Sequence, residues 1–214
     1  MFFELETGDI FSCYSPQFIP RFISLITFSL LAPKTLKYGP GHVATVVDYA
    51  GKKMWAESTT LTSHECVITG RKNPKGCQLH SPLTRITDYE EQNGSVHLYR
   101  LTPINSFRRE ERYTYSSIIT DHFIDNAVDY DTGGALLSGT RIVSKLTRLL
   151  PSDAISSVFC SELIAACLMR VGAMNRTNPT RYNPSTLLRT LVRTGVYEYM
   201  GEVKNIHGTL TLVP

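Results

Sequence analysis

The stretch HVATVVDYAGKKMWAES, residues 42–58, contains two segments of β-forming residues on either side of a short turn. β-Branched residues predict a strand over 43–48, and residues 54–58 predict a second strand that pairs back on the first. Residues 49–52 include a glycine, as is typical of a tight turn. We therefore expect an antiparallel hairpin, and an antiparallel sheet around it.

Two polar residues near the ends of this hairpin, His42 and Glu57, are expected to share one of its faces. With a loop of two or four residues, the two residue numbers of every cross-strand pair add up to an odd number. Even-numbered residues of the first strand therefore face the same side as odd-numbered residues of the second. A carboxylate there can bind one ring nitrogen and leave the other for a thiol, which is the orienting role of the third member of a catalytic triad. The alternative is a strand-end histidine beside a solvated glutamate.

The remaining segments predict a single α+β domain over 1–214, because no repeat, linker or change of composition divides the chain. The expected helices are 16–31, 82–91, 106–129, 156–171 and 184–193, with a less regular one over 140–150. The further expected strands are 10–12, 66–69, 78–80, 96–101, 196–200 and 209–213.

The composition is that of a folded globular protein. The 214 residues are 42% hydrophobic and 19% charged, which excludes a disordered tail, a collagen-like fibre and a low-complexity linker. The formal charge is +3, and 22 Lys and Arg are scattered among 19 Asp and Glu. Nucleic-acid binders usually cluster their basic residues, so we expect no nucleic-acid partner.

The cysteines and the N-terminal region bear on the compartment. Five cysteines at irregular spacing do not resemble a disulfide framework, which favours a reducing environment. The acidic start of the chain lacks the basic region of a signal peptide, and the apolar stretch 18–32 is interrupted and too short for a transmembrane span. We expect a cytoplasmic or particle-associated protein. The stripe Phe18, Phe22, Ile26 and Leu30 is expected in the core, with peripheral membrane or lipid contact through 18–32 as the alternative.

Cys160 is the strongest candidate for a reactive group. It follows Ser156 and Ser157, either of which can cap a helix, so we expect Cys160 in the first helical turn. The free N–H groups and the dipole of a helix start favour a thiolate, which is a nucleophile when a base lies beside it. The alternative is a buried structural cysteine.

These residues, taken in order, resemble a known enzyme family. The chain looks like the circularly permuted NlpC/P60 group of papain-like enzymes (the YiiX/YaeF type), in which the histidine strand precedes the cysteine helix. The resemblance covers about residues 7–171, and residues 184–213 would complete the domain. The matching elements are Gly8-Asp9-Ile10, Gly41-His42-Val43, Ala56-Glu57-Ser58, Leu98-Tyr99-Arg100, Asp129-Tyr130-Asp131 and Phe159-Cys160-Ser161-Glu162-Leu163-Ile164.

The resemblance implies a cysteine hydrolase with a permuted papain-like fold and no cofactor. Cys160 is similar to the family's nucleophile, His42 to its base and Glu57 to its orienting residue. Tyr130 and Asp131 resemble a pair that helps form the substrate groove, and we expect Ser161 to contact the substrate as well. Two departures are that Gly41 replaces the family's usual polar residue, and that 30–41 and 133–156 are longer than typical.

Three functions follow as expectations. The first is cleavage of an amide bond through an acyl-enzyme, in a peptidoglycan stem peptide or another peptide, with the N–H of Cys160 as one oxyanion donor. The second is hydrolysis or transfer of a thioester, ester or lipid acyl group on the same fold. The third is a non-catalytic component of a larger assembly such as a virion.

A metal site is a weaker alternative. His64, Cys66, Cys77 and His80 are residue types that bind zinc, but the first pair is closer in sequence than zinc ligands usually are. We therefore expect no metal. The other cysteines and His97, His122 and His207 are expected to be structural.

Overall fold

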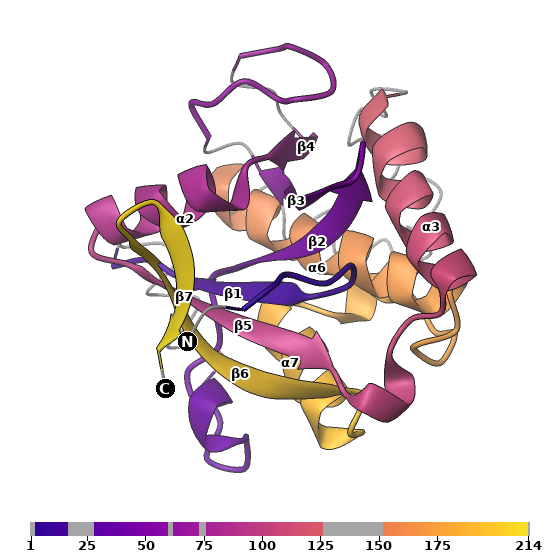
Figure 1. Cartoon of the computed structure of the whole chain (residues 1–214). Coiled ribbons are helices and arrows are strands. Elements are labelled where there is room, and N and C mark those ends of the chain that lie inside the picture. The colour runs from indigo at the N-terminus through magenta and orange to yellow at the C-terminus, as the bar shows by residue number, and fades with distance from the viewer. Residues whose placement is uncertain (1–2, 17–27, 60–61, 73–75, 126–151, 214) are drawn as a thin grey trace.

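The computed structural model describes residues 3–16, 28–59, 62–72, 76–125 and 152–213, without the side chains of 125 and 152–159. Within these ranges, four α-helices accompany one seven-stranded antiparallel sheet (Figure 1). The strands are β1 (Ile10–Tyr14), β2 (His42–Tyr49), β3 (Lys52–Thr59), β4 (Gly76–His80), β5 (Ser95–Leu101), β6 (Tyr197–Ile206) and β7 (Thr209–Val213). Their order across the sheet is β4-β3-β2-β1-β5-β6-β7. The mixed α+β class and the antiparallel sheet are therefore confirmed.

The central hairpin has the predicted register. Thr45 pairs with Ala56 and Tyr49 with Lys52, so the paired numbers add to an odd sum. Ala50 and Gly51 form the two-residue loop, and both have positive φ angles, 51° and 74°. Two successive residues with positive φ match the twist of a tight β-hairpin.

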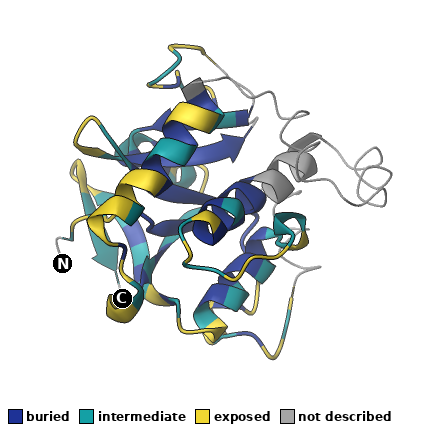
Figure 2. Ribbon diagram, turned by 90° about the vertical axis from the view of Figure 1, so that its right-hand side faces the viewer, coloured by how far each residue is buried: buried dark blue, intermediate teal, exposed yellow. Residues whose placement is uncertain are grey.

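Helices cover both faces of the sheet. The long helix α6 (Ser152–Arg170) packs against β2 and β3, and α7 (Pro184–Arg193) packs beside it. Their apolar side chains share one core with α3 (Arg109–Ser117), which continues as the π-helical segment η3 (Ile118–Asp125). On the other face, Ile86 of α2 (Pro82–Glu91) packs in a second core with Phe11 and Trp55. Buried residues make up most of β1 to β5 and of the described part of α6, whereas β6 and β7 are largely half-buried or exposed (Figure 2).

Several element predictions agree closely with the structure. Helices over 82–91 and 184–193 have the predicted bounds, and strands over 209–213 and 96–101 match β7 and, within one residue, β5. Asn183 caps α7 as predicted, because its Oδ1 accepts a hydrogen bond from the N–H of Thr186 at 2.9 Å.

Other element predictions are wrong. Residues 66–69 form turns beside a single bridge between Glu65 and Lys72 instead of a strand. Residues 28–31 are not helical, although most of the helix predicted over 16–31 lies outside the described residues. Leu30 is 74% exposed instead of buried, because it lies in a loop and not in a helix. The short helix of this loop, η1 (Lys34–Leu36), begins four residues later. The predicted segment 140–150 also lies outside the described residues. Among the helices of the described residues, none has the length and apolar character needed to cross a bilayer.

Candidate active site

A histidine and a glutamate meet across the central hairpin. His42 begins β2, and its Nε2 lies 2.8 Å from Oε2 of Glu57 on β3. The strand register accounts for this contact, because Glu57 falls opposite Ala44 and thus diagonally across from His42 on the same face. The Glu57 side chain is fully buried, while that of His42 is 13% exposed. The predicted pairing of these residues is confirmed.

Glu57 is held on its other side by a buried arginine. Nε of Arg85, on α2, donates to Oε1 of Glu57 at 2.6 Å, and its Nη2 lies 3.3 Å from Oε2. Nη1 of Arg85 donates to Asp88 at 2.5 Å, and the guanidinium carbon lies 5.7 Å from the centre of the Tyr89 ring. The carboxylate of Glu57 is therefore fixed between an imidazole and a guanidinium.

Cys160 completes the cluster from the helical layer. It lies on α6 and is 1% exposed. His42 forms a side-chain hydrogen bond with Cys160, and because Nε2 of His42 is engaged by Glu57, Nδ1 is the nitrogen left for the sulfur. Glu57, His42 and Cys160 thus form a chain of contacts from β3 to α6.

Charges in the cluster are mutually stabilised. Burial lowers the pKa of His42, but the Cys160 sulfur and the Glu57 carboxylate outweigh it and raise this pKa to about 10. Burial raises the pKa of Glu57, but Arg85 and His42 outweigh it and leave the pKa well below its usual range. The arrangement therefore favours an imidazolium between two groups that can carry negative charge.

The expectation that Cys160 begins its helix is wrong. The helix α6 starts at Ser152, about two turns before Cys160, and not at Ser156 or Ser157. Interior N–H groups of a helix bind carbonyls one turn earlier, and the dipole acts mainly at the first turn. The N–H of Cys160 is therefore not a free oxyanion donor, and the neighbouring His42 replaces the helix start as the group that can activate the thiol.

Cys13 also lies close to His42 but is unsuited to act as a nucleophile. It pairs with His42 across β1 and β2, is 1% exposed and forms a hydrogen bond with Tyr89. Burial and the charge of Glu57 raise the pKa of Cys13 well above its usual value. Because only the thiolate is a strong nucleophile, Cys13 is the weaker candidate of the two.

The expected substrate residues are only partly described. Ser161 is fully buried, and its hydroxyl donates to the carbonyl of Tyr182 at 2.6 Å. This bond fastens α6 to the segment before α7, which is a structural role that the sequence did not indicate. Tyr130 and Asp131 lie outside the described residues.

The candidate zinc ligands have separate partners. His64 contacts Asp88 at 2.9 Å, His80 contacts Gln78 at 2.8 Å, and Cys66 accepts from the N–H of Leu79 at 3.4 Å. In the described part of the chain, no group of three or more His, Cys, Asp or Glu side chains could hold a metal ion.

Arg85 is the main site residue that the sequence analysis missed. The predicted helix over 82–91 contains it, but only the packing of that helix brings the guanidinium to Glu57. A basic residue on an otherwise half-buried helix was the one available signal.

Comparison of the sequence with protein-family models and with curated proteins finds no match.

Proposed function

We propose that this protein is a cysteine hydrolase of the permuted papain-like type, with Cys160 as nucleophile, His42 as acid–base and Glu57 as the orienting residue. The observation that carries the proposal is the uninterrupted series of contacts from Glu57 through His42 to Cys160. Nucleophile, base and orienter in hydrogen-bonding reach are the geometric signature of covalent catalysis.

The reaction proceeds through an acyl-enzyme. Nδ1 of His42 takes the thiol proton, and the sulfur of Cys160 forms a bond to the substrate carbonyl carbon. His42 then gives the proton to the leaving amine as the carbon–nitrogen bond breaks. Water, deprotonated by His42, attacks the thioester, releases the acid and restores the thiol. Glu57 and Arg85 keep the imidazole oriented throughout.

Of the three side chains in the cluster, only that of His42 is partly exposed. The thiol and the carboxylate are buried, whereas His42 retains 13% of its side-chain surface. The substrate class that we propose first is a peptide amide, such as that of a peptidoglycan stem peptide. Thioesters, esters and lipid acyl groups are the alternative substrates for the same three residues.

The test is hydrolysis by the purified protein of a soluble muropeptide, a short acyl thioester and an activated ester. Wild-type protein should hydrolyse at least one of them, and Cys160→Ala should reduce kcat/KM by roughly 1,000-fold or more. Cys167→Ala is the matched control, because this buried cysteine lies two turns further along α6 and should leave activity intact. Full activity of the Cys160→Ala protein would refute the proposal.

A labelling measurement separates an enzyme from a non-catalytic assembly component. A small alkylating reagent should modify Cys160 before the other cysteines and abolish activity. The preference should disappear in His42→Ala, because the imidazole no longer takes the thiol proton. Equal labelling of Cys160 in both proteins, without turnover of any substrate, would favour the structural role.

The pH profile is a further readout of the same mechanism. The rate should fall as His42 loses its proton near pH 10, which gives the descending side of a bell-shaped dependence of kcat/KM. A rate that continues to rise well above that pH would show that His42 does not act as the proton donor.

A further inference from the structure

Large apolar side chains are exposed together on the loop before β2. Phe28 is 43% exposed, Leu30 74%, Leu31 90% and Tyr38 54%. These four residues are named here the loop patch. The rings of Phe28 and Tyr38 contact each other, with centroids 5.0 Å apart. Adjacent leucines with this exposure cost free energy in water, and clustered exposed apolar groups usually mark an interaction surface.

The loop patch is presented by a well-anchored segment. Leu36 is fully buried, and Arg189 of α7 donates to the carbonyl of Leu36 at 2.7 Å and to that of Lys37 at 3.1 Å. The N–H of Ser29 donates to the carbonyl of Lys37 at 2.9 Å, which closes the loop on itself. The leucines at its tip are therefore displayed by the fold.

The charged residues of the loop that carries the patch are all basic. Lys34 and Lys37 are exposed on the same loop, and the sequence has no Asp or Glu from residue 10 to residue 47. Arg189 and the exposed Arg193 lie one turn apart on α7, the helix that anchors the loop. This side of the molecule thus combines exposed apolar side chains with basic residues.

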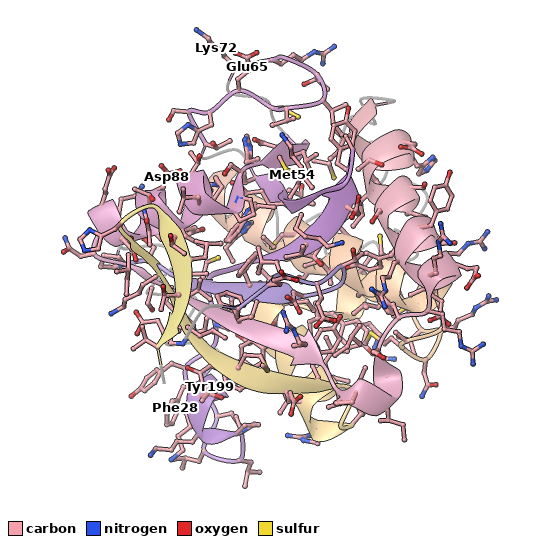
Figure 3. All side chains as sticks on the ribbon, in the orientation of Figure 1. Phe28, Met54, Glu65, Lys72, Asp88 and Tyr199 are labelled. Carbon is pink, nitrogen blue, oxygen red and sulfur yellow. The ribbon has the colours of Figure 1, made fainter. Side chains whose placement is uncertain are left out.

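Aromatic residues extend the same end of the molecule. In the view of Figure 3, Phe28 and Tyr199 both appear at the lower end of the molecule. Tyr199 is 36% exposed, and its ring lies 5.4 Å from that of Tyr99, whose hydroxyl contacts Thr35 at 3.4 Å. Tyrosine rings at the rim of an apolar surface are typical of side chains that lie at the headgroup level of a bilayer.

We propose that the loop patch binds peripherally to an anionic lipid surface. Leu30 and Leu31 enter the interface, the aromatic rings lie at headgroup level, and Lys34 and Lys37 contact anionic headgroups. Charge complementarity selects this occupant, because an acidic surface matches the lysines while a second copy of the chain would bring like charges together. The proposal does not depend on the hydrolase activity.

The experiment is co-sedimentation of the full chain with phosphatidylcholine vesicles that contain or lack one-quarter phosphatidylglycerol. Wild-type protein should bind the anionic vesicles and lose most binding in 1 M NaCl, because salt screens the lysines. Leu30→Ser with Leu31→Ser, and separately Lys34→Glu with Lys37→Glu, should each weaken binding about 20-fold or more.

Matched controls come from other parts of the surface. Ile104, 92% exposed on η2 (Pro103–Asn105), is changed to Ser, and the exposed Lys52 and Lys72 are changed to Glu. Both controls should bind as wild type does. Thermal unfolding of every variant checks that the fold is retained, and a variant that has unfolded is replaced by its milder counterpart, Leu31→Ser or Lys34→Gln.

Two results would overturn the proposal. One is absence of binding to anionic vesicles, or equal binding by the patch variants and their controls. The other is a wild-type dimer in light scattering that becomes monomeric in the Leu30→Ser, Leu31→Ser protein, which would assign the loop patch to contact between copies of the chain.

Discussion

Arg85 and Glu57 form a buried ion pair whose partners depend on each other. Removing one member of such a pair leaves an uncompensated charge, whereas replacing both is often tolerated. We expect Glu57→Gln and Arg85→Met each to lower the free energy of unfolding by about 3 kcal/mol. The double variant should lose clearly less than the sum. Urea unfolding of the four proteins gives the coupling energy, and additive losses would show that the pair contributes no net interaction.

The shifted pKa values of Glu57 and His42 also make the stability of the fold depend on pH. Because the pKa of Glu57 is lowered in the folded protein, its contribution is complete above the pKa of the unfolded chain and is lost as pH falls below it. His42 behaves in the opposite way. Its raised pKa gives a contribution that is complete below the unfolded pKa and is lost as pH rises toward about 10. Both contributions are therefore complete only at pH values above the pKa of Glu57 and below the pKa of His42 in the unfolded chain.

Glu162 is a second buried carboxyl with a testable pH dependence. It is 5% exposed, and burial raises its pKa to about 7. The folded protein therefore keeps this proton to a higher pH than the unfolded chain, so stability falls as pH rises from about 4.5 toward 7. Glu162→Gln should raise the free energy of unfolding by about 1–3 kcal/mol at pH 8 and leave it unchanged at pH 4. Equal effects at both pH values would contradict this cause.

At the scale of elements, the start of α7 depends on a single cap. Asn183 accepts the N–H of Thr186, and the helix then buries Leu187, Leu188 and Leu191 in the main core. Asn183→Ala should lower the free energy of unfolding by about 1 kcal/mol, a fall in Tm of roughly 2–4 °C for a chain of this size. Asn183→Ser keeps a capping oxygen and should cost much less. Equal losses in the two variants would show that the cap is not the cause.

Elements also differ in how well local patterns predict them. Residues 82–91 and 184–193 carry their own start signals, a proline at the first helical position and, for the second, the Asn183 cap. The sequence predicts the start of α6 four residues late, because two serines resemble a cap although they lie inside the helix. Serine in a helix interior gives the same local signal as serine at its start, and only the continuing hydrogen bonds distinguish them.

At the scale of the whole molecule, the fold is held together without covalent links. All five cysteines are free, and Cys13, Cys66, Cys160 and Cys167 are buried. The midpoint of thermal unfolding should therefore be the same with and without dithiothreitol. Thiol titration in denaturant should give five reactive groups. A lower midpoint in the reductant, or fewer than five thiols, would reveal a disulfide that this structure does not contain.

The sequence by itself determined the central hairpin, its register and therefore the meeting of His42 with Glu57. Strand pairing repeats with a period of two, so a short turn is enough to decide which side chains share a face. The sequence points to Cys160 for the wrong local reason, since its predicted helix start lies in the helix interior. Only the tertiary structure decided that α6 brings this thiol to His42, that α2 brings Arg85 to Glu57, and that Leu30 and Leu31 face outward. Those outcomes depend on how separate elements pack, and contacts between residues far apart in the chain leave no local pattern from which they can be read.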